Sequence, residues 1–306
     1  MSNTQIAEFI SGYKEEGKSG WRGLERVNLE SSIRKFVSDN PERFSIDLSD
    51  FLTVHRKYQH ALLRGLEEAW RNNRDFDWTH LLEFILEGLN DKAFWKEKAA
   101  KDAYDYNERI LGTIADLIQD GTKSDKHAFA VALLPLAEKI LFILLEKTTS
   151  NMKMISDYVT SVINSTRGKV FIAAVNYSLR CARQSGKGEN ERWVQPIKND
   201  FTKRLDRSFE PSLEFSVVLG MYLVNFLYLD KQWVHSNINS IFIKGNDEHW
   251  EAAFSGYITL SSTVYEEVYK LLKEHGHYEK GLSFSYKDKH TESKLVQHIV
   301  IGGGMI

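Results

Sequence analysis

The sequence predicts an all-α protein, an α-α superhelix in which degenerate helix pairs stack side by side as a solenoid. Apolar residues recur with the helical period along the chain, and only 4 prolines and 19 glycines interrupt its 306 residues. No convincing series of alternating strands separates the helical segments, which disfavours a parallel sheet with crossover helices. We expect about thirteen to fifteen helices with short connectors, in a single domain over residues 1–306.

Three segments of the first half show this pattern most clearly. Residues 77–88 combine Asp77, a typical N-cap, with an apolar stripe that ends at a glycine. Residues 104–121 carry a second apolar stripe closed by Gly121. In residues 124–147 we expect Pro135 to kink or split the helix, because proline removes a hydrogen-bond donor and clashes with the preceding turn.

The second half continues the pattern and adds helices without a polar face. Residues 167–183 and 213–229 are apolar almost all the way round, so each helix must be covered on several sides. Inner helices of a stacked array of helix pairs meet that requirement. The polar stretch 184–191, QSGKGENE, is expected to be an exposed loop. Further predicted N-caps are Asn151, Thr166, Ser212, Asp230 and Asn246, and Gly256 and Gly276 are predicted helix ends.

Composition excludes several classes of protein. Hydrophobic residues make up 42% and aromatic residues 12%, which is typical of a folded chain and not of disorder. The net charge of -2 gives no overall attraction to nucleic acid or anionic lipid. Cys181 is the only cysteine, so no intrachain disulfide can form. The most membrane-like run, residues 215–229, is too short to cross a bilayer, and we expect a cytoplasmic protein that does not enter the membrane.

Residues 12–19, GYKEEGKS, match a phosphate-binding loop, with Gly12, Gly17, Lys18 and Ser19 in register. Such a loop needs a core strand before it, whereas QIAEFI at residues 5–10 has the spacing of a short amphipathic helix. Two glutamates also lie where the negative phosphates would bind. We therefore interpret the match as accidental and expect no bound nucleotide.

The other matches to catalytic or metal-binding motifs in the sequence are incomplete. Ser32–Lys35 and Ser38–Asn40 match the S-x-x-K and S-D-N pieces of penicillin-recognising enzymes, but both lie in one helix and its end, and no K-T-G follows. The histidines form no H-E-x-x-H motif, and one cysteine cannot supply a multi-thiolate zinc site. We expect no catalytic residue, cofactor or metal.

Positive charge gathers between residues 166 and 210, where ten Lys and Arg face five acidic residues. Within this stretch Arg180, Arg183, Lys187 and Arg192 surround the predicted 184–191 loop. Such a group can dock an acidic protein surface and speed encounter. We predict it as the partner-binding patch. Solvated helix faces are the ordinary interpretation of such charges, and nucleic-acid binding through residues 167–207 is a further alternative.

Five stretches resemble known proteins. They are GWRGLERV (20–27), NPERFSIDLSDF (40–51), NSTRGKVFIAAVNYSLRCAR (164–183), EPSLEFSVVLGMYLVNFLYLDKQWVHSNINSIF (210–242) and HWEAAFSGYI (249–258). They resemble the HEAT- or TPR-like helical-repeat regions of large bacterial proteins that carry an upstream STAND-type NTPase or sirtuin module, several of which act in anti-phage defence. Neither module is in this sequence, which ends at IVIGGGMI within a continuing helical pattern. A fragment of a larger multidomain protein, an engineered chain and a truncated reading frame are the three interpretations of that ending.

The resemblance implies a non-enzymatic recognition module that binds a protein partner, as the sensor region of a defence system. It supplies no catalytic residue. The enzymatic alternative is a divergent nucleotide hydrolase that uses Lys18.

Overall fold

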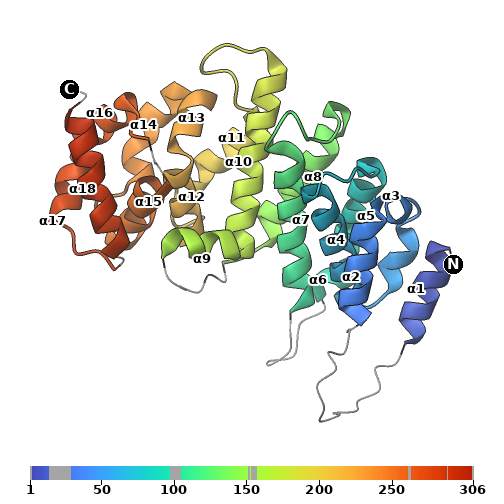
Figure 1. Cartoon of the computed structure of the whole chain (residues 1–306). Coiled ribbons are helices and arrows are strands. Elements are labelled where there is room, and N and C mark those ends of the chain that lie inside the picture. Colours follow the sequence, from blue (N-terminus) through green and yellow to red (C-terminus); the bar gives the residue numbers. More distant parts are fainter. Residues whose placement is uncertain are drawn as a thin grey trace, which may run out of the picture. The chain divides into compact units, whose positions relative to one another are not determined.

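Every regular element in the described part of the chain is a helix (Figure 1). The computed structural model describes residues 2–13, 29–96, 105–150, 152, 157–260, 263–287 and 289–304. Eighteen α-helices and two 3-10 helices lie in these residues, and no strand does. The all-α prediction is confirmed. The helices outnumber the predicted thirteen to fifteen because several elements are shorter than two turns.

The chain divides into two compact units, residues 1–147 and 148–306, where the sequence predicts one domain. The helices of the first unit are α1 (Asn3–Gly12), α2 (Leu29–Asp39), α3 (Pro41–Phe44), η1 (Ser49–Thr53), α4 (Arg56–Arg71), α5 (Trp78–Asn90), α6 (Lys92–Lys96), α7 (Tyr106–Thr122), η2 (Val131–Leu133) and α8 (Leu134–Lys147). Those of the second unit are α9 (Tyr158–Asn164), α10 (Thr166–Ser185), α11 (Gln195–Arg204), α12 (Leu213–Met221), α13 (Leu223–Leu229), α14 (Lys231–Ile241), α15 (Asp247–Leu260), α16 (Glu266–Glu274), α17 (His277–Ser283) and α18 (Lys289–Gly303).

In the first unit α4 is the central helix, packed against α2 on one side and α7 on the other. Leu62 and Leu66 of α4 are completely buried in this contact layer. Gly65 lets α2 approach closely, because a Cβ atom there would lie 2.7 Å from both the carbonyl oxygen of Arg34 and the Cβ of Val37. A larger residue at 65 would push the two helices apart.

In the second unit α10, α12, α15 and α18 form a series in which each helix contacts the next. The closest pair is α12 and α15. A Cβ on Gly220 would lie 1.9 Å from the carbonyl oxygen of Ala253, and a Cβ on Gly256 would lie 2.4 Å from that of Val217. Gly256 therefore lies inside α15, where it allows close contact with α12. The prediction that it ends a helix is wrong.

Several predicted caps are confirmed and others shift. Asp77 accepts from the backbone N–H groups of Thr79 and His80 at 2.8 and 3.2 Å, and Asp230 accepts from that of Trp233 at 2.8 Å. The N-cap of α10 is Ser165 instead of the neighbouring Thr166. The predicted cap Asn151 lies outside the described residues.

Two predicted helices have different limits in the structure. Residues 124–130 are not helical and Pro135 occupies the first turn of α8, so the proline begins a helix instead of kinking one. The apolar segment 213–229 is divided at Tyr222 into α12 and α13. Among the described residues no helix combines the length and apolar character needed to cross a bilayer.

Candidate binding groove

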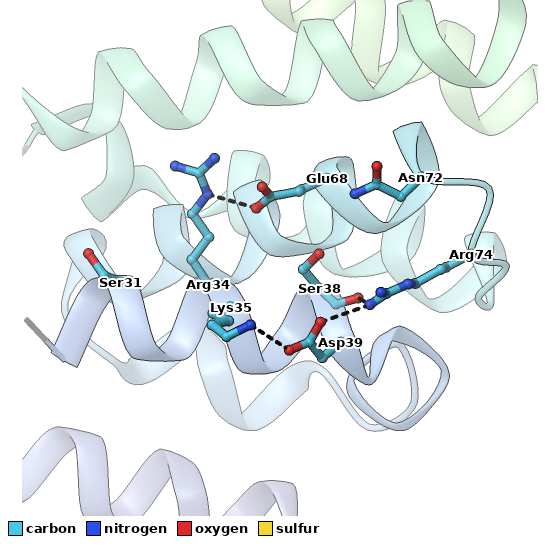
Figure 2. A pocket seen from close by; sticks show the side chains of 8 residues that line it. All are labelled: Ser31, Arg34, Lys35, Ser38, Asp39, Glu68, Asn72 and Arg74. Atoms are coloured by element: carbon cyan, nitrogen blue, oxygen red, sulfur yellow. Dashed lines mark hydrogen bonds and ion pairs between the residues drawn. The ribbon is translucent and has the colours of Figure 1, made fainter. Parts of the chain in front are cut away.

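A polar groove lies between α2 and α4 in the first unit (Figure 2). Its volume is about 410 Å³. Ser38 is buried, Glu68 is half-buried and the other lining residues are exposed. The side chains that line the groove are Ser31, Arg34, Lys35, Ser38, Asp39, Glu68, Asn72 and Arg74.

The spacing of polar residues on the two helices places them along the groove. On α2, positions 31, 34, 35 and 38 follow the i, i+3, i+4, i+7 pattern of one helix face. On α4, Glu68 and the residue after the helix, Asn72, are four apart. Beneath them the close contact at Gly65 holds the two helices together. The groove is thus a surface above a tightly packed helix pair.

Three ion pairs fix the charged side chains of the groove. The Nε of Arg34 lies 3.0 Å from Oε2 of Glu68, across from α2 to α4 (Figure 2). Asp39 binds two cations, with the Nζ of Lys35 at 3.2 Å and Nη1 of Arg74 at 3.0 Å. Hydrogen bonds from Arg74 and then Lys35 hold the pKa of Asp39 below its usual value, so its carboxylate stays ionised at neutral pH.

Both arginines keep donors that the groove does not use. Arg74 also donates from Nη1 to the carbonyl oxygen of Ser38 at 2.6 Å. In the described residues, no hydrogen bond involves the two Nη atoms of Arg34, Nε and Nη2 of Arg74, or the side-chain amide of Asn72. With three cations against two carboxylates, the groove presents oriented donors suited to carboxylate or carbonyl oxygens.

The sequence singled out only part of this groove. Lys35 matches an S-x-x-K pattern with Ser32, but its amino group binds Asp39 and makes no hydrogen bond to Ser32 within the described residues. Glu68 and Arg74 belong to no motif in the sequence. The polar face of α2 by itself indicates only a solvated surface. Glu68 and Arg74 meet it after the two helices pack, so no local signal in the sequence identifies them.

The GYKEEGKS pattern falls mostly outside the described residues. Gly12 is the last residue of α1, whereas Gly17, Lys18 and Ser19 are not among the residues described. The segment before the pattern is helical, as its spacing predicts, where a phosphate loop would follow a strand.

The four residues of the predicted partner-binding patch differ in their exposure. Arg180 is buried, with 7% of its surface exposed, and Arg183 is half-buried. Lys187 is exposed in the stretch 184–191, which is exposed throughout and whose first two residues are the end of α10. Arg192 lies against Tyr228, its guanidinium carbon 4.5 Å from the ring centre and its Nη1 3.1 Å from the Tyr228 carbonyl oxygen.

This loop also exposes two acidic side chains, Glu189 and Glu191. Because Arg180 is buried and two carboxylates lie among the remaining cations, the surface here is not uniformly basic. An acidic partner would meet both signs of charge at this loop.

Some of the cations between residues 166 and 210 are buried inside the second unit. Arg167 and Arg204 are each 4% exposed, and both bind the buried carboxylate of Glu210. Arg204 also binds Asp200 at 2.6 Å. Burial lowers the pKa of the nearby Arg207 to about 10, although the Glu210 charge acts in the opposite direction. Arg167 and Arg204 are therefore unavailable to the phosphates of a nucleic acid.

Comparison with known proteins adds no assignment. No protein-family model, curated protein or solved structure matches the chain. In the described ranges no group of three or more His, Cys, Asp or Glu side chains is arranged to hold a metal ion. The α2–α4 groove is therefore proposed as a candidate site from its geometry, without support from a related protein.

Proposed function

We propose that this chain is a non-enzymatic helical-repeat module, an α-α solenoid, that binds a protein partner. Helix contacts support the repeat architecture, since α10, α12, α15 and α18 contact one another in series, and α2, α4 and α7 do the same in the first unit. Repeat proteins built from helix pairs are stabilised mainly by such contacts between neighbours.

The observation that carries the binding proposal is the α2–α4 groove. It is open and polar, and its cations are held by ion pairs while keeping spare donors. Small apolar ligands generally need an enclosed apolar cavity, whereas protein surfaces are recognised by fixed hydrogen-bond donors and by Arg and aromatic side chains. A protein segment therefore suits this groove better than a small apolar molecule.

The sequence resemblance suggests the biological setting. As part of a bacterial anti-phage defence protein, the module would serve as the sensor that recognises a partner, with the enzymatic step performed by another module. This setting adds no catalytic residue to the chain and leaves the groove as the part that makes contact.

Affinity capture from cells of the source organism tests the proposal. The wild-type chain is compared with Arg34→Glu/Arg74→Glu, which reverses two groove cations, and with Lys126→Glu, an exposed lysine elsewhere in the first unit. Captured proteins are then purified and mixed with the chain in an ultracentrifuge. We expect a protein that forms a defined complex with the wild type and the Lys126 variant. Failure of every captured protein to form a complex after purification would contradict the function.

A further inference from the structure

A second hollow adjoins the groove and differs from it in charge. Its volume is about 430 Å³, and it shares Asp39 and Arg74 with the groove. The two hollows thus continue into one another at the end of α2. The residues that line the second hollow are Asp39, Asn40, Pro41, Glu42, Arg43, Arg74 and Asp75.

The two hollows carry opposite surplus charge. In the groove, Arg34, Lys35 and Arg74 outnumber the two carboxylates that hold them. Beyond the shared residues, the second hollow contains two acids, Glu42 and Asp75, and one arginine. Neither acid forms an ion pair within the described residues, and both are exposed. The continuous surface is therefore positive at one end and negative at the other.

An exposed aromatic ring lies beside the negative end. Phe36 has 46% of its surface exposed, and the guanidinium of Arg43 lies 5.6 Å from its ring centre. Arg43 also lies over Phe44, at 5.4 Å from that ring, so its charge is already directed toward two aromatic faces. Phe36 gives this end an apolar contact of the kind that anchors protein interfaces.

We propose that the groove and the second hollow together bind an extended segment of the protein partner in which acidic and basic residues are separated. Acidic side chains bind beside Arg34 and Arg74, a basic side chain binds beside Glu42 and Asp75, and an apolar side chain contacts Phe36. This inference rests on the proposed function and specifies the partner's chemistry. The surplus charge of this surface changes sign from one end to the other and so selects such a segment, because a uniformly acidic one meets repulsion at Glu42 and Asp75.

Fluorescence anisotropy with two labelled synthetic peptides tests this inference on the full chain. The peptides share one composition of Glu, Leu and Lys, with the charges separated in one and alternating in the other. We expect the separated peptide to bind more tightly and to weaken as salt is raised, since the contacts are exposed ion pairs. Arg34→Gln and Glu42→Gln should each weaken it roughly two- to fivefold. The matched controls Lys126→Gln and Glu83→Gln should leave its Kd unchanged.

The inference would be overturned by equal binding of the two peptides, by absence of binding, or by a Kd that neither Arg34→Gln nor Glu42→Gln changes. The proposed function has a separate outcome. If a captured partner still forms a complex with the purified chain while the separated peptide does not bind, the chain is a recognition module whose partner uses other chemistry. If the separated peptide binds but no partner complex forms, the charge inference stands and the proposed function fails.

Discussion

Gly220 and Gly256 determine how closely α12 and α15 pack in the second unit. Each faces a carbonyl oxygen of the other helix at a distance that excludes a side chain. The sequence predicts a buried helix over 213–229 and a second helix that begins at Asn246 and ends at Gly256. It cannot show this contact, because a glycine in a helix pattern indicates an end as readily as a close approach. The same limit applies to Arg180, since composition counts a charge without showing that the side chain is buried.

Gly220→Ala should lower the free energy of unfolding by about 3 kcal/mol, because the new methyl group must displace the α15 backbone. Gly188→Ala is the matched control, as a Cβ there meets no atom within 4 Å, and its effect should stay below about 0.5 kcal/mol. Urea denaturation followed by tryptophan fluorescence measures both. Equal stability of the two variants would show that α12 and α15 do not pack as described.

His277 makes the second unit sensitive to acid. It is fully buried, its Nδ1 accepts from Nε1 of Trp250 at 3.2 Å, and its Nε2 has no hydrogen-bond partner in the described residues. Burial, followed by the charges of Lys244 and its neighbours, lowers the pKa of His277 to about 3. The unfolded chain therefore binds a proton below about pH 6.5 that the folded chain does not.

The stabilisation that neutral His277 gives the folded state is fully present above about pH 6.5 and declines as the pH falls toward 3. Between pH 7.5 and pH 5 the loss should be about 2 kcal/mol. His277→Gln, which keeps an acceptor for Trp250, should reduce this pH dependence, whereas His235→Gln, at an exposed histidine of the same unit, should retain it. Denaturation at the two pH values measures the difference. An unchanged pH dependence in His277→Gln would contradict this account of the site.

At the scale of the element, helix positions follow from local chemistry and groove geometry does not. Asp77 and Asp230 cap helices as the sequence predicts, because an N-cap is set by residues within one turn. Pro135 shows the limit of such rules, since proline is equally suited to the first turn of a helix. The α2–α4 groove depends on the ion pair between Arg74 and Asp39. Arg74 follows α4 whereas Asp39 ends α2, so the two residues meet only after the helices pack.

Asp77→Ala should destabilise the first unit by about 1 kcal/mol through loss of the α5 cap. Asp75→Ala, at an exposed residue two positions earlier whose side chain forms no hydrogen bond or ion pair within the described residues, should change stability by less than about 0.5 kcal/mol. Thermal unfolding followed by circular dichroism compares them. The same unfolding midpoint in the two variants would contradict the contribution of the Asp77 cap.

At the scale of the whole molecule, the all-helical architecture could be predicted because helical periodicity and sparse proline act along the entire chain. The division into units at residue 147 could not, since apolar helices continue on both sides of it. The enzymatic alternative also belongs at this scale, because a phosphate loop requires a sheet that supports it, and the described residues contain no strand.

Calorimetric titration with magnesium-ATP distinguishes the enzymatic alternative from a recognition module. We expect no binding heat from the wild-type chain or from Lys18→Ala. A binding heat that the wild type shows and Lys18→Ala loses would establish the GYKEEGKS stretch as a nucleotide site.

Hydrogen exchange of the full chain, free and in complex with the purified captured partner, tests the central claim most directly. Recognition through the α2–α4 groove predicts slower exchange in residues 29–44 and 66–75, with little change in α8. Unchanged exchange in both groove segments, with protection confined to another part of the chain, would contradict the account.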